Sequence, residues 1–211
     1  MQSNRKSIIA YVSIIFSMIF WGISFVWTKE LLNANFPVFL ILTIRLAIAS
    51  LLMFSVFKLM GKLERIEKTD LPKFFLLALF EPFLYFIGEN FSMHFVDASF
   101  AAIMIALLPI VNPIALHIFN KDKIGWNLLF GAVISVIGIM IMSINPEGEI
   151  KISWQGTLLL LLAVFAGSGY SVILSRLINK YNPITITTTQ NIVGILYFLP
   201  CLLIFDLDKI S

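Results

Sequence analysis

Seven long apolar runs limit what this chain can fold into. They cover residues 8–28, 37–57, 74–95, 98–119, 126–143, 155–175 and 185–205, and short connections separate them. A bilayer core of about 30 Å needs about 20 helical residues to cross it. In lipid, a helix satisfies its own backbone hydrogen bonds. The sequence therefore predicts an all-α polytopic membrane protein with about seven transmembrane helices.

Composition supports a membrane protein and excludes several kinds of site. Of the 211 residues, 59% are hydrophobic and 13% are charged, whereas soluble domains are nearer half apolar and a quarter charged. The single cysteine, Cys201, excludes an internal disulfide and a cysteine cluster for a metal. The sequence has no phosphate-binding loop and no nucleic-acid signature. We therefore expect no metal, no cofactor and no nucleic-acid partner.

The positions of lysine and arginine predict the orientation in the membrane. If the N-terminus is cytoplasmic, eleven of the fifteen basic residues lie in inner segments, and only Lys29, Lys151 and Lys209 lie in outer ones. The remaining one, Arg45, lies inside an apolar run. Cytoplasmic loops are enriched in lysine and arginine. The bias therefore predicts a cytoplasmic N-terminus and, with an odd number of spans, an outer C-terminus.

A faint internal repeat relates the two ends of the chain. Residues 21–25 align with residues 166–170, and Pro37 then matches Pro183 at the start of a later run. Five spans separate the two copies, so the second copy crosses the membrane in the opposite direction. Inverted repeats recur in secondary transporters, whose substrate sites lie near the bilayer midplane between the halves.

Several motifs in the first five runs have the order and spacing of one known pattern. They are Trp21-Gly22-x-Ser24-Phe25, Pro37 followed by Arg45, the segment Asp97–Ala102 leading to Leu108-Pro109, Asp122-Lys123, and Gly131 with Gly138. With these motifs the chain resembles the EamA-type transporter family of the drug/metabolite transporter (DMT) superfamily. That family usually has Glu-Arg where this chain has Asp122-Lys123, a change that keeps both charges.

The resemblance implies an architecture and a function. Such proteins have ten helices in two inverted five-helix repeats (5+5) and export small metabolites, amino acids or drugs. Residues 8–143 resemble one complete repeat, and residues 155–205 resemble the first two helices of an incomplete second one. The resemblance thus implies a truncated secondary-active exporter working by alternating access, not an enzyme, in the plasma (bacterial inner) membrane. Its expected partners are a small-molecule solute, a proton or sodium ion, the lipid bilayer, and a second copy in a homodimer.

Three ionisable residues lie within the runs, where charge is costly and marks candidate functional sites. They are Arg45, Glu81 and Glu89. Glu81, Tyr85 and Glu89 are spaced by four and share one helical face. We expect Glu81 to titrate or to bind a cationic part of a substrate, with Tyr85 and Asn90 lining the cavity. A structural ion pair between Arg45 and Glu89 is the favoured alternative for Arg45, and both interpretations stay open for Glu81.

Further candidates come from other runs. Asn112 lies between two helix-breaking prolines, Pro109 and Pro113, near the depth of Glu81, and is predicted to form a cavity floor. Pro113 also fits a kink that only shapes packing. Trp21, Ser24 and Tyr170 come from the two repeat copies and are predicted to form the upper wall, although aromatic residues near helix ends are often interface anchors.

Other functions compete with transport. A seven-helix receptor or sensor fits the span count, but the last run has no lysine for a retinal Schiff base. A truncated fragment without transport activity is a further alternative. An intramembrane enzyme would need a convergent set of nucleophile and base, or of metal ligands, which the sequence does not present. The sequence favours transport and leaves the substrate undetermined.

Overall fold

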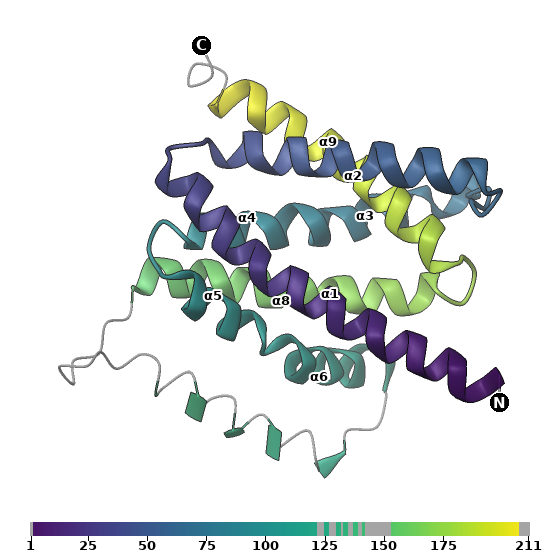
Figure 1. The fold of residues 1–211 in the computed structure, drawn as a ribbon, viewed down its shortest axis with the longest axis horizontal. Helices are drawn as coiled ribbons and strands as arrows, with labels where there is room; N and C mark the ends of the chain where they lie inside the picture. The colour runs from purple at the N-terminus through teal and green to yellow at the C-terminus, as the bar shows by residue number, and fades with distance from the viewer. Residues whose placement is uncertain are drawn as a thin grey trace.

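A computed structural model describes residues 2–121, 125–126, 130–131, 133–134, 137–138, 141 and 153–206 (Figure 1), with side chains described from Tyr11 onward. Within this part of the chain all regular elements are helical, and six helical segments are long and apolar enough to cross a membrane. The all-α polytopic prediction is therefore confirmed. Most of the predicted span 126–143 lies outside the described residues.

The observed spans follow the predicted runs to within a few residues. The first two are α1 (Gln2–Asn33) and α2 (Val38–Leu59). The third begins earlier than predicted, with η1 (Lys68–Asp70), and continues as α3 (Leu71–Ala78), η2 (Leu79–Leu84) and α4 (Tyr85–Ser92). The fourth consists of α5 (Ala98–Ile105) and α6 (Leu108–Asn120). After the incompletely described stretch come α8 (Trp154–Leu177) and α9 (Pro183–Phe205).

Two of these spans are interrupted. In the third, Glu81 leaves helical geometry, with φ −142° and ψ 122°, immediately before Pro82. Proline has no N–H to donate to the preceding turn, so the break leaves polar backbone inside the span. In the fourth, α5 ends before Pro109, which lies in the first turn of α6, whereas α6 continues through Pro113.

The third span lies at the centre of the helix packing. The most extensive helix pair is α2 with α9, and α8 packs along both α4 and α6. Gly88 of α4 permits the close approach of α8, because a Cβ there would lie 2.8 Å from the Ala163 backbone nitrogen. Figure 1 shows α1 crossing the other helices obliquely. Few side chains of α1 are buried, namely Phe25, Thr28 and Leu32.

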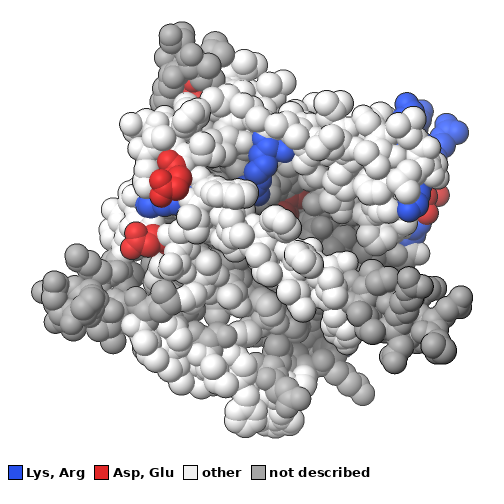
Figure 2. Space-filling model, in the orientation of Figure 1, with Lys and Arg blue, Asp and Glu red and all other residues white. Residues whose placement is uncertain are grey.

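Connections alternate between two ends of the molecule. At one end, the segment between α2 and α3 is hydrogen-bonded to the α8–α9 connection, where the Glu67 N–H donates to the Tyr181 hydroxyl (3.1 Å), and to the first turn of α9, where the Glu64 N–H donates to Thr185 Oγ1 (2.9 Å). At the other end, the Phe39 N–H donates to Asp206 Oδ2 (3.0 Å), and Lys29 Nζ donates to the Val96 carbonyl (3.1 Å). On the face drawn in Figure 2, coloured charges lie toward the left and right, and between them one blue group is surrounded mostly by uncharged residues. This alternation is what successive membrane crossings require.

Candidate functional site

The helix break places Glu81 between α8 and α9. Its carboxyl group lies within electrostatic range of Glu89 and of Tyr170 on α8, and Tyr170 in turn interacts with Gln190 on α9. Close packing holds this arrangement, since a Cβ on Gly194 of α9 would lie 2.5 Å from Pro82 Cγ. The break therefore exposes Glu81 to polar groups from two later helices.

Tyr85 and Glu89 follow on one face of α4, which begins four residues after Glu81. Tyr85 is 2% exposed, and Glu89 and Asn90 are each 1% exposed. The Tyr85 hydroxyl interacts electrostatically with both glutamates and with Arg45. We call Glu81, Tyr85, Glu89, Asn90, Tyr170 and Gln190 the interior polar cluster. It brings together residues of η2, α4, α8 and α9.

Many polar atoms around this cluster have no hydrogen-bond partner. Within the described residues, the unpartnered buried atoms include Tyr85 Oη, Glu89 Oε2, Asn90 Oδ1 and Gln190 Oε1. Hydroxyl groups on the two helices that flank the cluster share this property, namely those of Thr43, Ser50 and Thr188. Buried polar groups are normally paired. Unpartnered polar atoms are therefore concentrated in this part of the described interior.

Sequence reasoning missed the contributions of α2 and α9 to this region. Thr43 and Ser50 are isolated, uncharged, small polar residues in an apolar helix. Such residues carry no sequence signal for a site. The run Thr187–Asn191, in contrast, is a visible block of polar residues within a membrane span. That block was a usable signal for the contribution of Thr188 and Gln190.

Arg45 does not form the predicted ion pair with Glu89. Its guanidinium carbon lies 4.3 Å from the ring centroid of Phe86, and the ion pairs of the described residues do not include it. A guanidinium is planar and stacks well on an aromatic face. Phe86 therefore covers one face of the guanidinium, while Glu89 interacts with Arg45 electrostatically without forming an ion pair.

The residues predicted to form one cavity fall into different places. Trp21, Pro109 and Asn112 line a cavity of about 430 Å³ between α1 and the α5–α6 span. Ser24 and Arg45 instead line one of about 360 Å³ between α1 and α2. Neither cavity is lined by a member of the interior polar cluster, to which Glu81, Tyr85, Glu89, Asn90 and Tyr170 belong. The oblique course of α1 produces this division, because it leaves a gap on each side of the helix.

Asn112 takes part in a hydrogen bond between two helices. Its Oδ1 accepts a hydrogen bond from Ser168 Oγ of α8 at 3.0 Å. Ser24 Oγ likewise donates to a backbone carbonyl, that of Trp21, at 2.6 Å. These two side-chain oxygens therefore have partners within the protein, unlike Glu89 Oε2 and Asn90 Oδ1, although Asn90 Nδ2 donates to the Phe86 carbonyl at 2.8 Å.

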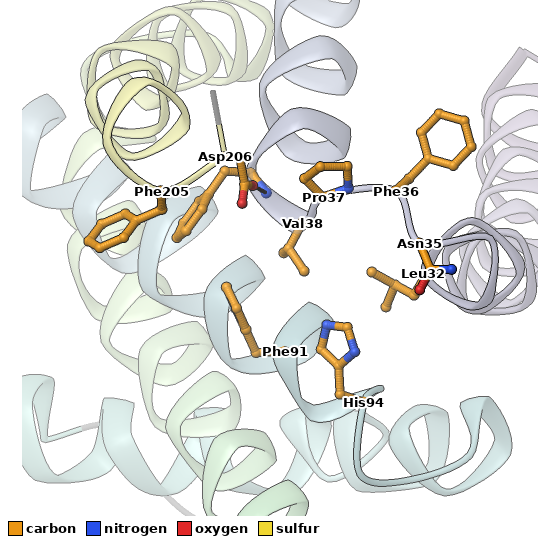
Figure 3. A pocket seen from close by; sticks show the side chains of 10 residues that line it. Leu32, Asn35, Phe36, Pro37, Val38, Phe91, His94, Phe205 and Asp206 are labelled. Carbon is orange, nitrogen blue, oxygen red and sulfur yellow. Dashed lines mark hydrogen bonds between the residues drawn. The ribbon is translucent and has the colours of Figure 1, made fainter. Parts of the chain in front are cut away.

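A third cavity, of about 560 Å³, lies at the end of the molecule where α9 finishes (Figure 3). The rings of Phe39, Phe91 and Phe205 line it, with 5.4 Å between the centroids of Phe39 and Phe91 and 5.7 Å between those of Phe39 and Phe205. His94 and Asp206 add polar groups. This cavity was not predicted from the sequence, because its lining comes from segments far apart along the chain.

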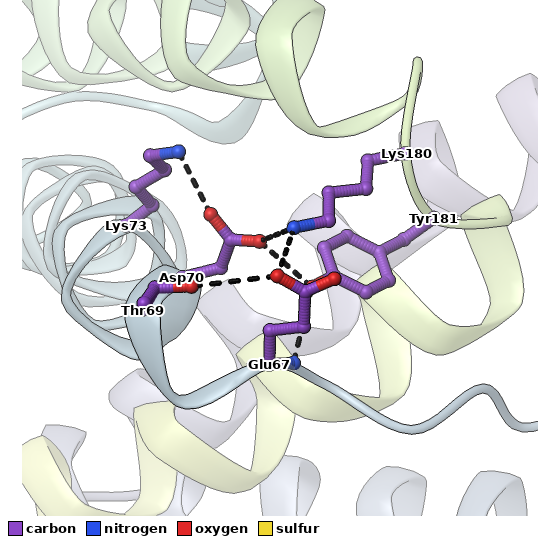
Figure 4. A network of polar contacts seen from close by, with 6 residues as sticks. All are labelled: Glu67, Thr69, Asp70, Lys73, Lys180 and Tyr181. Atoms are coloured by element: carbon purple, nitrogen blue, oxygen red, sulfur yellow. Dashed lines mark hydrogen bonds and ion pairs between the residues drawn. The ribbon is translucent and has the colours of Figure 1, made fainter.

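The opposite end is closed by a network of charges (Figure 4). Lys180 Nζ lies 2.6 Å from both Asp70 Oδ2 and Glu67 Oε2, and Lys73 Nζ lies 2.8 Å from Asp70 Oδ1. The Tyr181 hydroxyl donates to Asp70 Oδ2 at 2.8 Å. We call Glu67, Asp70, Lys73, Lys180 and Tyr181 the polar clasp. The two carboxylates beside Lys180 raise the pKa of its ammonium group above the usual range.

The sequence matches the EamA-like transporter family over residues 8–144. This chain belongs to that family. It is similar to an uncharacterized transporter of Archaeoglobus fulgidus, with 29% identity over 192 residues that cover 91% of this chain and 67% of the relative. The uncharacterized transporters YdfC and YcxC of Bacillus subtilis are 29% and 25% identical, over 85% and 90% of this chain and 59% and 61% of their own lengths. The chain thus spans about three fifths to two thirds of these relatives. No solved structure matches it.

Membership in the EamA-like family agrees with the multi-pass membrane fold and implies handling of small-molecule solutes. The family match ends before α8 and α9 begin. Nevertheless, Tyr170 and Gln190 of the interior polar cluster come from these two helices, and so do Lys180 and Tyr181 of the polar clasp. The EamA-like segment therefore shares both features with the residues that follow it.

Proposed function

We propose that this chain belongs to a secondary transporter that exports small solutes by alternating access, with the interior polar cluster as its solute site. The observation that carries the proposal is the group of buried, unpartnered polar atoms beside the break at Glu81. In a membrane interior such groups are costly unless they serve a substrate or ion pathway. Broken helices lining a midplane site are a recurring device of transporters.

The proposed halves are an inverted repeat. Residues 8–143 form the first repeat, and residues 155–205 form the first two helices of the second. The packing supports this division, because α2 and α9, which the repeat makes counterparts, form the most extensive helix pair. Both begin at a proline, Pro37 as the N-cap of α2 and Pro183 in the first turn of α9. The solute site then lies where the repeats meet.

The proposed solute is cationic or zwitterionic. Glu81 and Glu89 supply negative charge, and the rings of Tyr85 and Tyr170 supply faces that attract cations. A proton or a sodium ion is the proposed coupling ion, with Glu81 as the group that exchanges it. The positive group beside the cluster is Arg45 of α2, which interacts with Tyr85 and Glu89.

The two ends fit a state closed on one side. The polar clasp joins the segment between α2 and α3 to the α8–α9 connection, whereas a cavity of about 560 Å³ hollows the other end. The basic residues place the clasp in the cytoplasm under the proposed orientation. In this scheme the clasp must open for a solute to enter from the cytoplasm.

Replacement of the central carboxyl group tests the proposal. Export of ethidium, a cation, and of labelled serine, a zwitterion, would be compared between cells producing the wild-type protein and cells producing Glu81→Gln across a range of pH. We expect Glu81→Gln to lower export and to flatten its pH dependence, while Glu30→Gln, at an exposed acidic residue of α1, leaves both intact. Unchanged export with unchanged pH dependence in Glu81→Gln would show that the assignment is wrong.

A further inference from the structure

Arg45 is a charged group in a membrane span without a hydrogen-bond acceptor. Its guanidinium has five N–H donors, yet none donates a hydrogen bond to a residue that the structure describes. Phe86 covers one face of the group at 4.3 Å. Stacking on an aromatic ring leaves the N–H groups at the guanidinium edge available. Glu89 lies within electrostatic range of this charge but forms no ion pair with it among the described residues, so the edge of the guanidinium is left free to bind an anion.

The space beside Arg45 is suited to an apolar body. A cavity of about 360 Å³ lies between α1 and α2, within the size range of small-ligand sites. Among the described residues that line it, Arg45 is the only charged one, and the others are mostly apolar, including Trp27, Leu31, Leu40 and Ile44. Trp27 is 62% exposed and Ile44 is 49% exposed. The cavity is therefore open at the surface of the described chain, beside exposed apolar side chains.

We propose that this cavity binds an amphipathic organic carboxylate. The apolar body of the ligand lies between α1 and α2, and its carboxylate accepts two parallel hydrogen bonds from Arg45. Paired N–H groups match the two oxygens of a carboxylate, which makes this contact stronger and more directional than one with a point charge. The open side allows the ligand to enter from the bilayer, in which such acids partition.

The depth of Arg45 favours a carboxylate over the phosphate of a membrane lipid. Arg45 is the eighth residue of α2, about 10 Å from the start of the helix at the usual rise per residue. Phe86, against which the guanidinium stacks, also lies inside its span rather than at its end. Lipid phosphates stay in the interfacial region, whereas a free acid can follow its apolar body inward. This inference rests on a residue beside Tyr85 and Glu89 of the interior polar cluster, whereas the proposed function is tested at Glu81, so the two can fail separately.

Quenching of tryptophan fluorescence can test the site. The purified full chain in nonionic detergent would be titrated at about pH 9, where the acid is ionised, with ω-bromoundecanoate, whose bromine quenches nearby indole rings. The neutral matched probe is ω-bromoundecanol. We expect saturable quenching by the acid and about tenfold weaker binding of the alcohol. Trp27→Phe should remove most of the saturable quenching, because Trp27 lines the cavity. Equal binding of acid and alcohol would overturn the proposal.

Variants of Arg45 provide a second test of the site. We expect Arg45→Gln to weaken binding of the acid about tenfold and Arg45→Lys to weaken it less, while Arg176→Gln, at an exposed residue near the end of α8, leaves it unchanged. Unaltered affinity in Arg45→Gln, or in Arg45→Lys where the glutamine variant fails to fold, would overturn the proposal. In vesicles, an Arg45-dependent preference for brominated phosphatidylglycerol over brominated phosphatidylcholine would assign the site to a lipid headgroup and overturn the carboxylic acid assignment.

Discussion

At the scale of single residues, glycines decide how closely the central helices approach. An added Cβ at Gly88 would meet two backbone atoms of α8, at Leu159 and Ala163, whereas one at Gly22 would have no atom within 4 Å. Backbone atoms cannot yield as a flexible side chain can. We therefore expect Gly88→Ala to lower the free energy of unfolding by about 1–3 kcal/mol.

Gly22→Ala is the matched control for this prediction. Both substitutions add one methyl group to a helical glycine, and alanine is the better helix former by up to about 1 kcal/mol. Gly22→Ala should thus be neutral or stabilising. Unfolding in mild detergent, followed by circular dichroism, measures both variants. A Gly88→Ala protein as stable as the Gly22→Ala protein would contradict the close packing of α4 on α8.

Lys180 gives a prediction about pH. Its pKa is raised in the folded protein by the carboxylates of Asp70 and Glu67. A raised pKa stabilises the fold fully below the unfolded pKa, about 10.4 for lysine, and this contribution is lost as the pH rises through the folded pKa. The difference in unfolding temperature between wild type and Lys180→Met should therefore stay constant from about pH 6 to about pH 9. A difference that disappears within that window would contradict the polar clasp.

At the scale of helices and connections, the polar clasp should control access to the interior. Ser50 of α2 is 4% exposed, so Ser50→Cys, in a chain with Cys201→Ser, reports on opening. Asp70 binds Lys180, Lys73 and Tyr181, and Asp70→Asn removes its charge from all three contacts. We expect Asp70→Asn to increase labelling of the cysteine by a membrane-impermeant thiol reagent several-fold.

A control separates opening of the clasp from a general charge effect. The Lys73 side chain is 56% exposed and pairs with Asp70 within the same segment, so Lys73→Met leaves the link to Lys180 in place. It should not increase labelling. Equal labelling in the wild type, Asp70→Asn and Lys73→Met proteins would rule out the clasp as a gate.

Helices were more predictable from the sequence than the contacts between them. Long apolar runs predict membrane spans, and the observed spans follow these runs closely. The third span begins earlier, at Lys68, because a short helical turn with charged residues precedes its apolar part. The break at Glu81 was not predicted. A proline inside a span does not by itself show a break, because α6 continues through Pro113 whereas the third span is interrupted before Pro82.

The candidate site was predictable along one helix and not across helices. The spacing of Tyr85 and Glu89 predicted their common face, because helical period determines it, whereas Glu81 comes into electrostatic range of Glu89 across a break that the spacing did not reveal. The stacking of Arg45 on Phe86 and the clasp between Asp70 and Lys180 depend on how distant segments pack. A local sequence pattern does not determine which of several nearby groups a side chain will contact.

At the scale of the whole molecule, association of two copies stays a prediction. The described side chains of the first span are mostly exposed, including Ile15 and Ile19. Van der Waals packing of exposed helix faces drives association of membrane helices. Light scattering of the protein in mild detergent, corrected for bound detergent, should give the mass of a homodimer. A single monomeric species would contradict this expectation.

The central claim concerns the whole molecule: solute passes through the interior polar cluster. Counterflow measures this most directly, because labelled solute accumulates in vesicles only if the protein exchanges it for unlabelled solute trapped inside. With purified protein in vesicles and serine as the probe, we predict accumulation by the wild-type and Glu30→Gln proteins and at least about a tenfold slower rate for Glu81→Gln, equivalent to about 1.4 kcal/mol. Accumulation by Glu81→Gln at the wild-type rate, or none by the wild-type protein with either serine or ethidium, would contradict the account.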